Sequence, residues 1–530
     1  MVTLFPHQIN ALPKMQQMES VGNGGFLADE MGLGKTITMI SHCKQNPVNS
    51  GNIIVCPISV INNWKREIER VYEGQPTPTI FVYHGPKRKS EELNNNWDYV
   101  ITSYSLLTKG EPCTRSWSRA ILDESHIIRN GSKTDPPVVA KYAFQLSKKS
   151  VKVWCITGTP FNNRKEDICS QCMFLRAGQS EKIEFWNKRN KPVFSGWLNT
   201  FLLRRTKEGI LDPPIHHEII TQPTVLEECI MHFYERNLRA LVIMCITEEN
   251  PILKMDLMKS VNMAIQKIRV ISDSFYSTAL NLKLLSPLAS QDIGKIDEPA
   301  IDVFRTMFHI SLPDLILHNV AEYCGSDLNR FLLTFSTPGN ILKFNSKISE
   351  LVRILPGLID KDEKHGVVIF SQFVTVLKLV KSILTNVEIM EFNGEMNLQQ
   401  KDDVITSFNT SRKPRVLLAS LMSASIAISL HYGSSTVILF EPYHNSSIER
   451  QAQERVHRLG QTSQVNIYHF KSNCFIEIFI DSRKNQKDKI FDYVFDSTST
   501  DEVGNEDKLN GILSCLETWC CSKKKPVATP

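Results

Sequence analysis

The stretch Asp29-Glu30-Met31-Gly32-Leu33-Gly34-Lys35-Thr36 is the most informative place to begin, because it joins a glycine-rich turn to a lysine and a hydroxyl residue. It follows the small, apolar residues 24–28 and precedes the apolar residues 37–40, so it predicts a turn that opens a helix. The glycines let backbone N–H groups approach phosphate oxygens, and the helix N-terminus adds partial positive charge. We therefore predict a polyphosphate site in which Lys35 reaches the β- and γ-phosphates and the Thr36 hydroxyl is a ligand of Mg²⁺.

The loop departs from the general phosphate-loop pattern at one position. That pattern begins with glycine six residues before the lysine, and here Asp29 occupies the place. A lone glycine-lysine-threonine turn also fits an ordinary glycine-capped turn before a helix. The assignment therefore needs partners elsewhere in the chain.

Length and composition set the broad class. A chain of 530 residues is too long for one hydrophobic core and predicts about three domain-sized units. The net charge of +5 neither demands nor excludes a polyanionic partner. Since we find no long uncharged apolar run and no signal-peptide layout at the N-terminus, we expect a soluble intracellular protein with no membrane partner.

Cysteine usage indicates a reducing compartment. The thirteen cysteines are scattered and odd in number, which favours free thiols in the cytosol or nucleus. Cys169 and Cys172 have the spacing of metal ligands, but neither a second pair nor a neighbouring histidine accompanies them. We interpret them as two thiols on a helix and expect no structural zinc.

Short apolar runs separated by turns and helical patterns occur in two groups. Such runs are typical of parallel sheets that are covered on both faces by helices. The runs are 53–56, 79–83, 99–102, 120–122 and 153–157 in the first group, and 367–370, 389–392, 415–419, 436–440 and 465–468 in the second. Between the groups, residues 231–244 and 256–271 have helical patterns. The fold class predicted is α/β, with two similar sheets and a helical insertion between them.

An acidic pair follows one run of the first group. Asp123-Glu124-Ser125-His126 comes directly after 120–122, at the end of a strand where ligands of such sheets bind. One carboxylate there can hold Mg²⁺ opposite Thr36, and the second can orient or deprotonate an attacking water. The usual alternative interpretation of such an acidic pair is a solvated turn, but the phosphate loop upstream favours the catalytic interpretation. Thr157-Gly158-Thr159 ends another run with hydroxyls suited to sensing the γ-phosphate.

Two further signals lie at opposite ends of the chain. Arg455 and Arg458 are three apart, so on a helix they project from one face, and a guanidinium at the γ-phosphate stabilises transition-state charge. The alternative is a basic solvated helix. Gln8, upstream of the loop, can recognise an adenine edge with its paired donor and acceptor, or belong to a solvated helix start.

Together these motifs resemble those of the SWI/SNF-type DNA-dependent ATPases of helicase superfamily two. Even Asp29 is the residue that this family has in its loop. The resemblance covers roughly residues 4–495 and rests on the loop, Val55-Cys56-Pro57 with Asn63-Trp64, Asp-Glu-Ser-His with Ile128-Arg129-Asn130, Thr157-Gly158-Thr159-Pro160 with Asn163, Leu203-Arg204-Arg205-Thr206-Lys207, and residues 451–461.

The resemblance implies two RecA-like lobes with ATP and Mg²⁺ in the cleft between them and duplex DNA across both. The implied domains are an N-terminal RecA-like lobe (1–222), a helical protrusion and connector (223–345), a C-terminal RecA-like lobe (346–495) and an acidic then basic tail (496–530). The implied site residues are Gln8, Asp29, Glu30, Met31, Gly32, Leu33, Gly34, Lys35 and Thr36 for ATP, Thr36 and Asp123 for Mg²⁺, Lys35, Asp123, Glu124, Arg455 and Arg458 for catalysis, Ser125 and His126 beside the acidic pair, and Thr157, Gly158, Thr159 and Gln451 for coupling.

The function expected from the resemblance is an ATP-dependent translocase on duplex DNA that remodels protein–DNA complexes and regulates transcription. Its expected location is the nucleus, or the host nucleus if the chain is viral, with nucleosomes or the transcription machinery as candidate partners. Three alternatives remain open: a strand-separating helicase, a catalytically weakened DNA-binding scaffold and a metabolic phosphotransferase.

One segment departs from the family pattern. The resemblance places glycines at 424, 425 and 427, where this chain has Ala424, Ser425 and Ala427. If those backbones needed positive φ, each Cβ would cost about 1 kcal/mol or more. We therefore expect weaker ATP hydrolysis, or weaker coupling to DNA, than in a typical relative.

Overall fold

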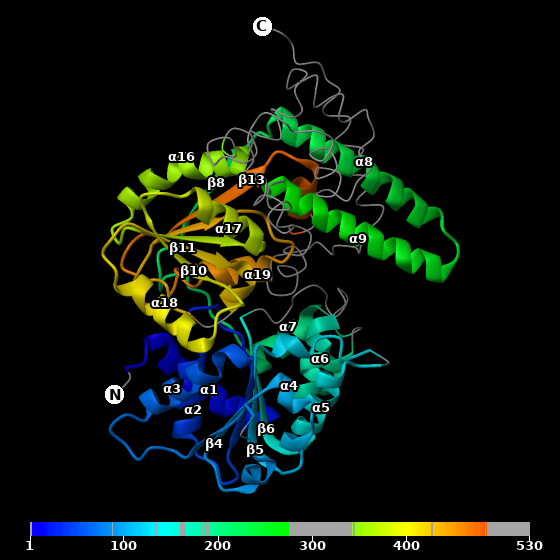
Figure 1. The fold of residues 1–530 in the computed structure, drawn as a ribbon. Helices are drawn as coiled ribbons and strands as arrows, with labels where there is room; N and C mark the ends of the chain where they lie inside the picture. Colours follow the sequence, from blue (N-terminus) through cyan, green and yellow to red (C-terminus); the bar gives the residue numbers. More distant parts are fainter. Residues whose placement is uncertain are drawn as a thin grey trace.

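The computed structural model describes residues 3–274, 342 and 345–484, except 87, 134, 159–165, 183–184, 186–190, 426–427 and 483. Figure 1 shows two lobes, with the N-terminal part of the chain in the lower one and the second group of strands in the upper one. Thr159, most of the predicted connector and the predicted tail (496–530) lie outside the described residues.

The first lobe is built on a parallel sheet in the order β3-β4-β2-β5-β6-β1-β7. Five of its strands lie where the first group of apolar runs predicts them. The strands are β1 (Gly24–Leu27), β2 (Asn52–Cys56), β3 (Ile80–Tyr83), β4 (Tyr99–Ser103), β5 (Trp117–Asp123), β6 (Ser150–Ile156) and β7 (Leu202–Leu203).

Helices cover both faces of this sheet, which is why its strands are apolar on both sides. In β2, Ile54 packs with α1, α2 and α3, whereas its neighbours Ile53 and Val55 pack with α4, α5 and α6 on the opposite face. The helices are α1 (Pro6–Gly22), α2 (Lys35–Gln45), α3 (Ile61–Val71), α4 (Tyr104–Leu107), α5 (Val138–Lys148), α6 (Glu166–Leu175) and α7 (Lys191–Phe201).

A buried ion pair ties α1 to the first sheet. The guanidinium of Arg119 on β5 donates from Nε to Oε1 of Glu19 on α1 over 2.7 Å, and Nε1 of Trp154 donates to the same oxygen over 2.7 Å. Nε2 of His42 lies 3.2 Å from that oxygen. Because both charges are satisfied inside the lobe, this pair is structural.

The second lobe repeats the design with a parallel sheet in the order β10-β11-β9-β12-β13-β8. Its strands are β8 (Ile215–Thr221), β9 (Gly366–Ser371), β10 (Glu388–Phe392), β11 (Arg415–Ser420), β12 (Thr436–Leu439) and β13 (Asn466–Ser472). The helices next to it in sequence are α16 (Ser346–Lys361), α17 (Val374–Ile383), α18 (Leu398–Thr410) and α19 (Ser446–Gln453). The predicted α/β class with two RecA-like lobes is confirmed.

Strand β8 corrects the predicted end of the first lobe at residue 222. It pairs in parallel with β13, from Ile215 opposite Asn466 to Thr221 opposite Ser472, and is an edge of the second sheet. The physical reason is that an edge strand exposes one side, so Ile-His-His-Glu-Ile-Ile-Thr has no continuous apolar run. The chain therefore enters the second lobe before residue 215.

The predicted helical insertion begins with two long helices, α8 (Val225–Thr247) and α9 (Pro251–Ser274), which run side by side out of the second lobe in Figure 1. A capping box starts α8, since Thr224 accepts from the N–H of Glu227 and Glu227 accepts from the N–H of Thr224. Glu227 Oε1 also accepts from the N–H of Ser346 over 3.1 Å, which joins α8 to the start of α16.

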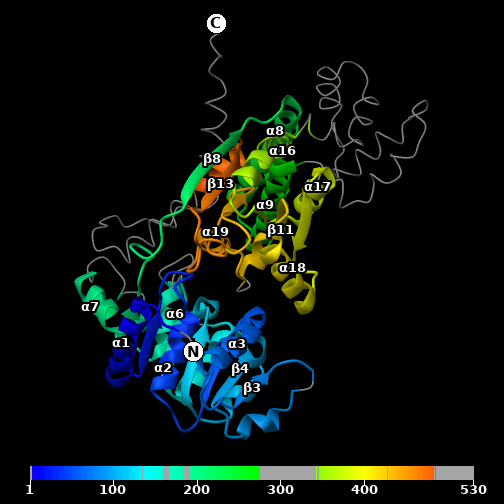
Figure 2. The same ribbon diagram turned by 90° about the vertical axis from the view of Figure 1, so that its left-hand side faces the viewer.

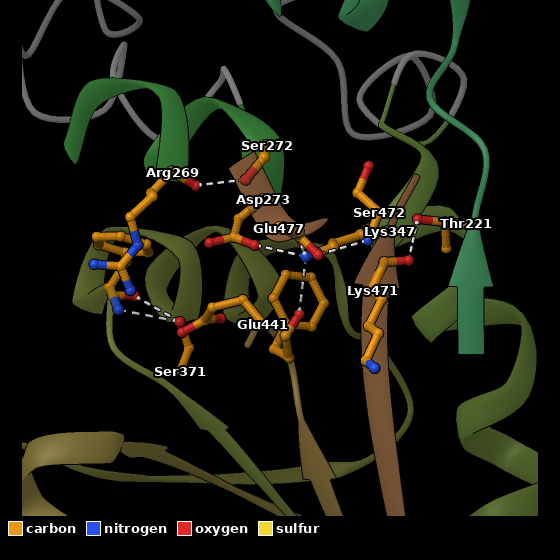
Figure 3. Close-up of polar contacts among 12 residues, drawn as sticks. Thr221, Arg269, Ser272, Asp273, Lys347, Ser371, Glu441, Lys471, Ser472 and Glu477 are labelled. Atoms are coloured by element: carbon orange, nitrogen blue, oxygen red, sulfur yellow. Dashed lines mark hydrogen bonds and ion pairs between the residues drawn. The ribbon is translucent and has the colours of Figure 1, made fainter. Parts of the chain in front are cut away.

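A buried polar network fixes the end of α9 to the second sheet (Figure 3). We call it the Lys347 joint; its members are Arg269, Asp273, Lys347, Glu441 and Glu477, each at most 5% exposed. Nζ of Lys347 donates to Oδ1 of Asp273 over 2.8 Å and to the carbonyl oxygen of Phe440 over 3.2 Å, and it pairs with Glu477. The joint thus holds α9, α16 and the ends of β12 and β13 together.

Two other sequence expectations concern absences. No helix within the described residues combines the length and the apolar character that a membrane span requires. Within the same residues, no group of three or more His, Cys, Asp or Glu side chains is arranged to hold a metal ion. Cys169 and Cys172 are buried in α6, and neither forms a disulfide within the described residues.

Candidate active site between the lobes

The phosphate loop has the backbone that its glycines predict. Gly32 and Gly34 have φ of 86° and 77°, in the left-handed region, and Gly34 caps the N-terminus of α2. A Cβ on Gly34 would lie 2.4 Å from Nε2 of Gln8, so a larger residue is excluded on two counts. Lys35 and Thr36 follow in the first turn of α2.

Gln8 supports this loop from α1. Its side chain is 2% exposed, and its Nε2 donates to the carbonyl oxygens of Gly34 and Leu33 over 3.3 and 3.4 Å. Its Oε1 accepts from the N–H of Phe5 over 3.0 Å. The structure thus places Gln8 against the phosphate loop, and recognition of adenine stays a prediction.

Asp29 anchors the loop to the end of β7. It is fully buried, and its Oδ1 accepts from the backbone N–H and Nε of Arg205 over 3.0 and 2.9 Å. The neighbouring Glu30 accepts from the N–H of Lys207 over 2.8 Å and donates its own N–H to the carbonyl of Arg205 over 2.9 Å. These contacts explain why a carboxylate replaces the first glycine of the general pattern, since its partner is Arg205.

Lys35 lies between the loop and the acidic pair. Its Nζ donates to the carbonyl oxygens of Asp29 and Glu30 over 2.9 and 3.2 Å. Burial lowers the pKa of Lys35, against the opposing effect of Glu124, Asp29 and Asp123. Three carboxylates thus surround Lys35 and favour its position between the phosphate loop and the acidic pair.

Asp123 and Glu124 end β5, as the sequence predicts. Oδ2 of Asp123 accepts from Nε1 of Trp64 on α3 over 2.7 Å, and its carbonyl accepts from the Tyr104 hydroxyl over 2.7 Å. Burial and the adjacent Glu124 raise the pKa of Asp123 to about 7, and burial also raises the pKa of Glu124. Glu124 has φ of 52°, an uncommon backbone for a residue with a side chain and one that functional sites retain.

His126 connects the acidic pair to the end of β6. Its Nδ1 lies 3.3 Å from Oε2 of Glu124 and 3.1 Å from the hydroxyl of Thr157. Ser125 instead donates to Oε1 of Gln171 on α6 over 2.7 Å, so it holds the turn to the lobe. A Cβ on Gly158 would lie 2.7 Å from Cγ of Met31 and 3.3 Å from Nζ of Lys35. Thr157 therefore meets His126 beside the acidic pair, and Gly158 lies against Met31 and Lys35 of the phosphate loop.

The second lobe places residues 454–458, which we call the arginine turn, against the phosphate loop. A Cβ on Gly32 would lie 3.2 Å from both Cβ of Arg458 and Oε2 of Glu454. Burial and Arg458 lower the pKa of Arg455 to about 10, and Glu124 partly offsets them. Arg455, Glu124 and Lys35 thus share one electrostatic environment.

The two arginines differ in their surroundings, and the predicted helix under them is wrong. Helix α19 ends at Gln453, so Arg455 and Arg458 lie in the turn beyond it, whereas Gln451 is buried within the helix. The guanidinium of Arg458 donates from one nitrogen to the Ser429 hydroxyl over 2.6 Å and to the Ile428 carbonyl over 3.3 Å. Arg458 is therefore engaged with its own lobe.

The substituted segment of the second lobe does not need glycine at two of its three positions. Ala424 and Ser425 lie in the 3-10 turn Leu421–Ser425, a right-handed backbone that residues with a Cβ adopt without strain. The condition for strain, a positive φ, is therefore not met at these two positions, and weaker hydrolysis or coupling stays a prediction. Ala427 lies outside the described residues.

The residues present fit a hydrated Mg²⁺. The donor set consists of the Thr36 hydroxyl and the Asp123 carboxylate, hard oxygen ligands of the kind that Mg²⁺ prefers. Burial raises the pKa values of these two adjacent carboxyl groups, and Lys35, with Arg455 at Glu124, offsets the rise only in part, so a divalent cation would supply further positive charge.

Three residues near the site had no role predicted from the sequence, namely Trp64, Arg205 and Lys207. Trp64 orients Asp123, Arg205 fixes Asp29, and Lys207 contacts the arginine turn. Each of these residues belongs to a motif quoted for the family resemblance, and this was the available signal for a role. Their hydrogen-bond partners, however, lie far away in sequence.

Two protein-family models match the chain. Residues 7–268 match the SNF2-related domain, and residues 346–460 match the helicase conserved C-terminal domain. The chain therefore belongs to the SWI/SNF-type ATPase family of helicase superfamily two.

The relatives found are distant. The chain is 25% identical to transcription termination factor 2 of Drosophila melanogaster, over 97% of this chain and 59% of that protein. It is 26% identical to a probable global transactivator of Orgyia pseudotsugata multicapsid polyhedrosis virus, over 94% of this chain and 92% of that protein. It is also 26% identical to the ATP-dependent helicase fft1 of Schizosaccharomyces pombe, over 92% of this chain and 52% of that protein. A solved Sulfolobus solfataricus SWI2/SNF2 ATPase core in complex with dsDNA is 22% identical, with a TM-score of 0.37 and coverage of 94% of each chain.

Proposed function

We propose that this chain is a DNA-dependent ATPase that moves along duplex DNA and displaces the proteins bound to it. The observation that carries the proposal is the contact between the arginine turn of the second lobe and the phosphate loop of the first. A cation from one lobe at the triphosphate of the other makes hydrolysis depend on how the lobes sit, and so couples chemistry to movement.

The chemistry divides between the lobes. Backbone N–H groups of the loop and Lys35 grip the phosphates, and Glu124 orients and deprotonates the attacking water. Arg455 stabilises the negative charge that develops on the γ-phosphate. Thr36 and Asp123 would hold Mg²⁺, which neutralises charge on the β- and γ-phosphate oxygens when bound.

The contacts of His126 offer a route from chemistry to movement. Because its ring meets both Glu124 and Thr157, a change at the water-activating carboxylate reaches the end of β6. Thr157 and Gly158 adjoin Lys35 and Met31 in turn. A cycle of binding, hydrolysis and release would thus alter how the lobes pack.

The DNA partner is supported by a cavity between α3 and α18, helices that face each other across the lobes in Figures 1 and 2. It measures about 480 Å³. Its lining includes the cations Arg66, Arg70 and Lys401, the carboxylates Glu67 and Asp402, and the amides of Asn62 and Asn409, so cations outnumber carboxylates. Cations and amides in a cleft suit a phosphate backbone and carry no base code. Binding should therefore be salt-sensitive and largely independent of sequence.

The proposed setting is transcription in the nucleus, or in the host nucleus if the chain is viral. It is supported by the names of two relatives, a transcription termination factor and a probable global transactivator. Nucleosomes or the transcription machinery are the corresponding partners.

The test is ATP hydrolysis by the purified protein with and without duplex DNA, followed by triplex displacement and strand separation on the same DNA. We expect DNA to stimulate phosphate release and the enzyme to displace a third strand without separating the duplex. Hydrolysis indifferent to DNA contradicts the proposal, and efficient strand separation favours the helicase alternative.

A further inference from the structure

Lys207 is a buried cation for which the proposed reaction has no task. It follows β7 in the first lobe, is 6% exposed, and is tied by its backbone N–H to Oε2 of Glu30 in the phosphate loop over 2.8 Å. The backbone of Lys207 is therefore fixed relative to the phosphate loop, whereas its side chain extends toward the second lobe.

That side chain crosses to the arginine turn of the second lobe. Nζ of Lys207 donates to the carbonyl oxygen of His457 over 2.7 Å and forms an ion pair with Glu454. The His457 ring strengthens the contact, since its Nε2 lies 2.9 Å from the carbonyl oxygen of Asp212 in the same connecting segment. Two residues that flank Arg455 in the turn are thus held by the first lobe.

The contact between Lys207 and the arginine turn lies beside the predicted triphosphate site but is not part of that site. A Cβ on Gly32 would lie 3.3 Å from Cε of Lys207, so the stem of the lysine packs on the loop itself. On another side, Glu30, Lys207, Glu454 and His457 line a cavity of about 780 Å³.

Charge makes the contact depend on the lysine. Glu454 pairs with the ammonium group of Lys207, and the charge of Glu30 opposes the lowering of its pKa, so a neutral side chain at 207 would leave two carboxylates that repel each other across the lobes. Burial lowers the pKa of Lys207 to about 7. The nearby charge of Glu30 opposes this shift, whereas the cations Lys35, Arg458 and Arg455 add to it. A lysine in such a place is costly, because its charge is removed from water.

We propose that Lys207 is a positioning residue that docks the arginine turn of the second lobe on the phosphate loop of the first. It acts on hydrolysis only through the turn, chiefly through Arg455, and does not itself bind the triphosphate. This inference rests on the proposed function, because it assigns a device to the same site.

The experiment compares the full-length wild type with Lys207→Met, Lys207→Arg and the neighbouring control Glu208→Gln in DNA-stimulated ATP hydrolysis. We expect Lys207→Met to lower kcat by ~30-fold while KM for ATP changes by less than about threefold, because an interaction made only in the transition state is lost. Lys207→Arg, which keeps the charge and the donor, should recover most of kcat, and Glu208→Gln should match the wild type. A raised KM with an unchanged kcat would mean that Lys207 binds nucleotide and would overturn the inference.

A double-mutant cycle separates positioning from a general structural role. If Lys207 acts through Arg455, then Lys207→Met combined with Arg455→Ala is no slower than Arg455→Ala alone, whereas multiplied losses overturn the inference. Glu454→Gln removes the other half of the ion pair and should reproduce the loss, which covers the case in which Lys207→Met does not fold. A wild type without DNA-stimulated hydrolysis defeats the proposed function, while an active wild type with a fully active Lys207→Met variant defeats only this inference.

Discussion

The two lobes share a parallel sheet covered by helices, yet the edges that they turn toward each other are chemically opposite. The first lobe presents glycines in the left-handed region and a carboxylate pair, while the second presents two arginines in the turn after α19. In the proposed function, the first lobe grips the triphosphate and activates water, and the second supplies cations. We therefore expect hydrolysis to require both lobes.

Removing the chemistry of the first lobe should have the largest effect. We expect Glu124→Gln to lower kcat by ~1,000-fold or more, because the amide cannot accept the proton of the attacking water. Lys35→Ala should abolish hydrolysis by loss of phosphate binding. Single-turnover phosphate release with bound DNA measures both, and substantial residual turnover in either variant contradicts these roles.

Removing the cation of the second lobe should come next. Arg455→Ala should lower kcat by ~1,000-fold with little change in ATP affinity, as an arginine that acts in the transition state does. Arg458→Ala should be milder, because that guanidinium is engaged with Ser429 and Ile428. Arg412, exposed on the same lobe, provides the control Arg412→Ala. Equal losses at 455 and 458 would show that both arginines reach the phosphates.

A smaller effect is expected from the residue that orients Asp123. Trp64→Phe keeps the ring but loses the indole N–H donated to the carboxylate, and should lower hydrolysis about tenfold at limiting Mg²⁺. Trp97→Phe is a matched control, since that indole donates to the carbonyl of Glu92 away from the cleft. Excess Mg²⁺ should restore much of the Trp64→Phe activity. A loss that no Mg²⁺ concentration relieves argues against a role in holding the metal ligand.

The smallest effects concern stability, where the buried charges of the two lobes should respond to pH in opposite directions. Burial alone would raise the pKa of Glu19, but hydrogen bonds from His42 and Arg119 hold it well below its usual range. Its contribution is present above the pH of an ordinary carboxyl group and is lost as the pH falls. In the Lys347 joint, burial raises the pKa of Glu441 to about 7, so its contribution is complete at low pH and is lost as the pH rises through about 7.

Urea unfolding at several pH values tests this difference. Glu441→Gln mimics the protonated carboxyl group and should gain stability relative to the wild type as the pH rises from about 5 to about 8. Glu19→Gln should be less stable than the wild type at pH 8, with the gap closing toward pH 4. Parallel pH profiles for the two variants would contradict the assignment.

The extent to which sequence predicts this molecule follows from how local each signal is. Strand β2 and its neighbours were predictable because strands buried on both faces are continuous apolar runs, whereas β8 was missed because an edge strand alternates. The loop and the acidic pair were predictable because each carries its chemistry in a few consecutive residues.

The partners of these motifs were not predictable from sequence. Arg205 meets Asp29 across 176 positions and Lys207 meets His457 across 250, and no local pattern encodes such contacts. The turn after α19 is a related case. The spacing of Arg455 and Arg458 is compatible with a helix, but tertiary contacts determine the backbone there. These are the contacts of the turn with the first lobe and the hydrogen bond from the N–H of Leu430 to the carbonyl of Arg455.

The central claim is that both lobes of one chain act on one triphosphate. Phosphate release on duplex DNA by the wild type, by Lys35→Ala, by Arg455→Ala and by an equal mixture of the two variants tests it directly. We predict that the wild type turns over ATP, that each variant is inactive, and that the mixture stays inactive because neither chain holds a complete site. Wild-type turnover by either variant, or recovery of activity in the mixture, would contradict the account.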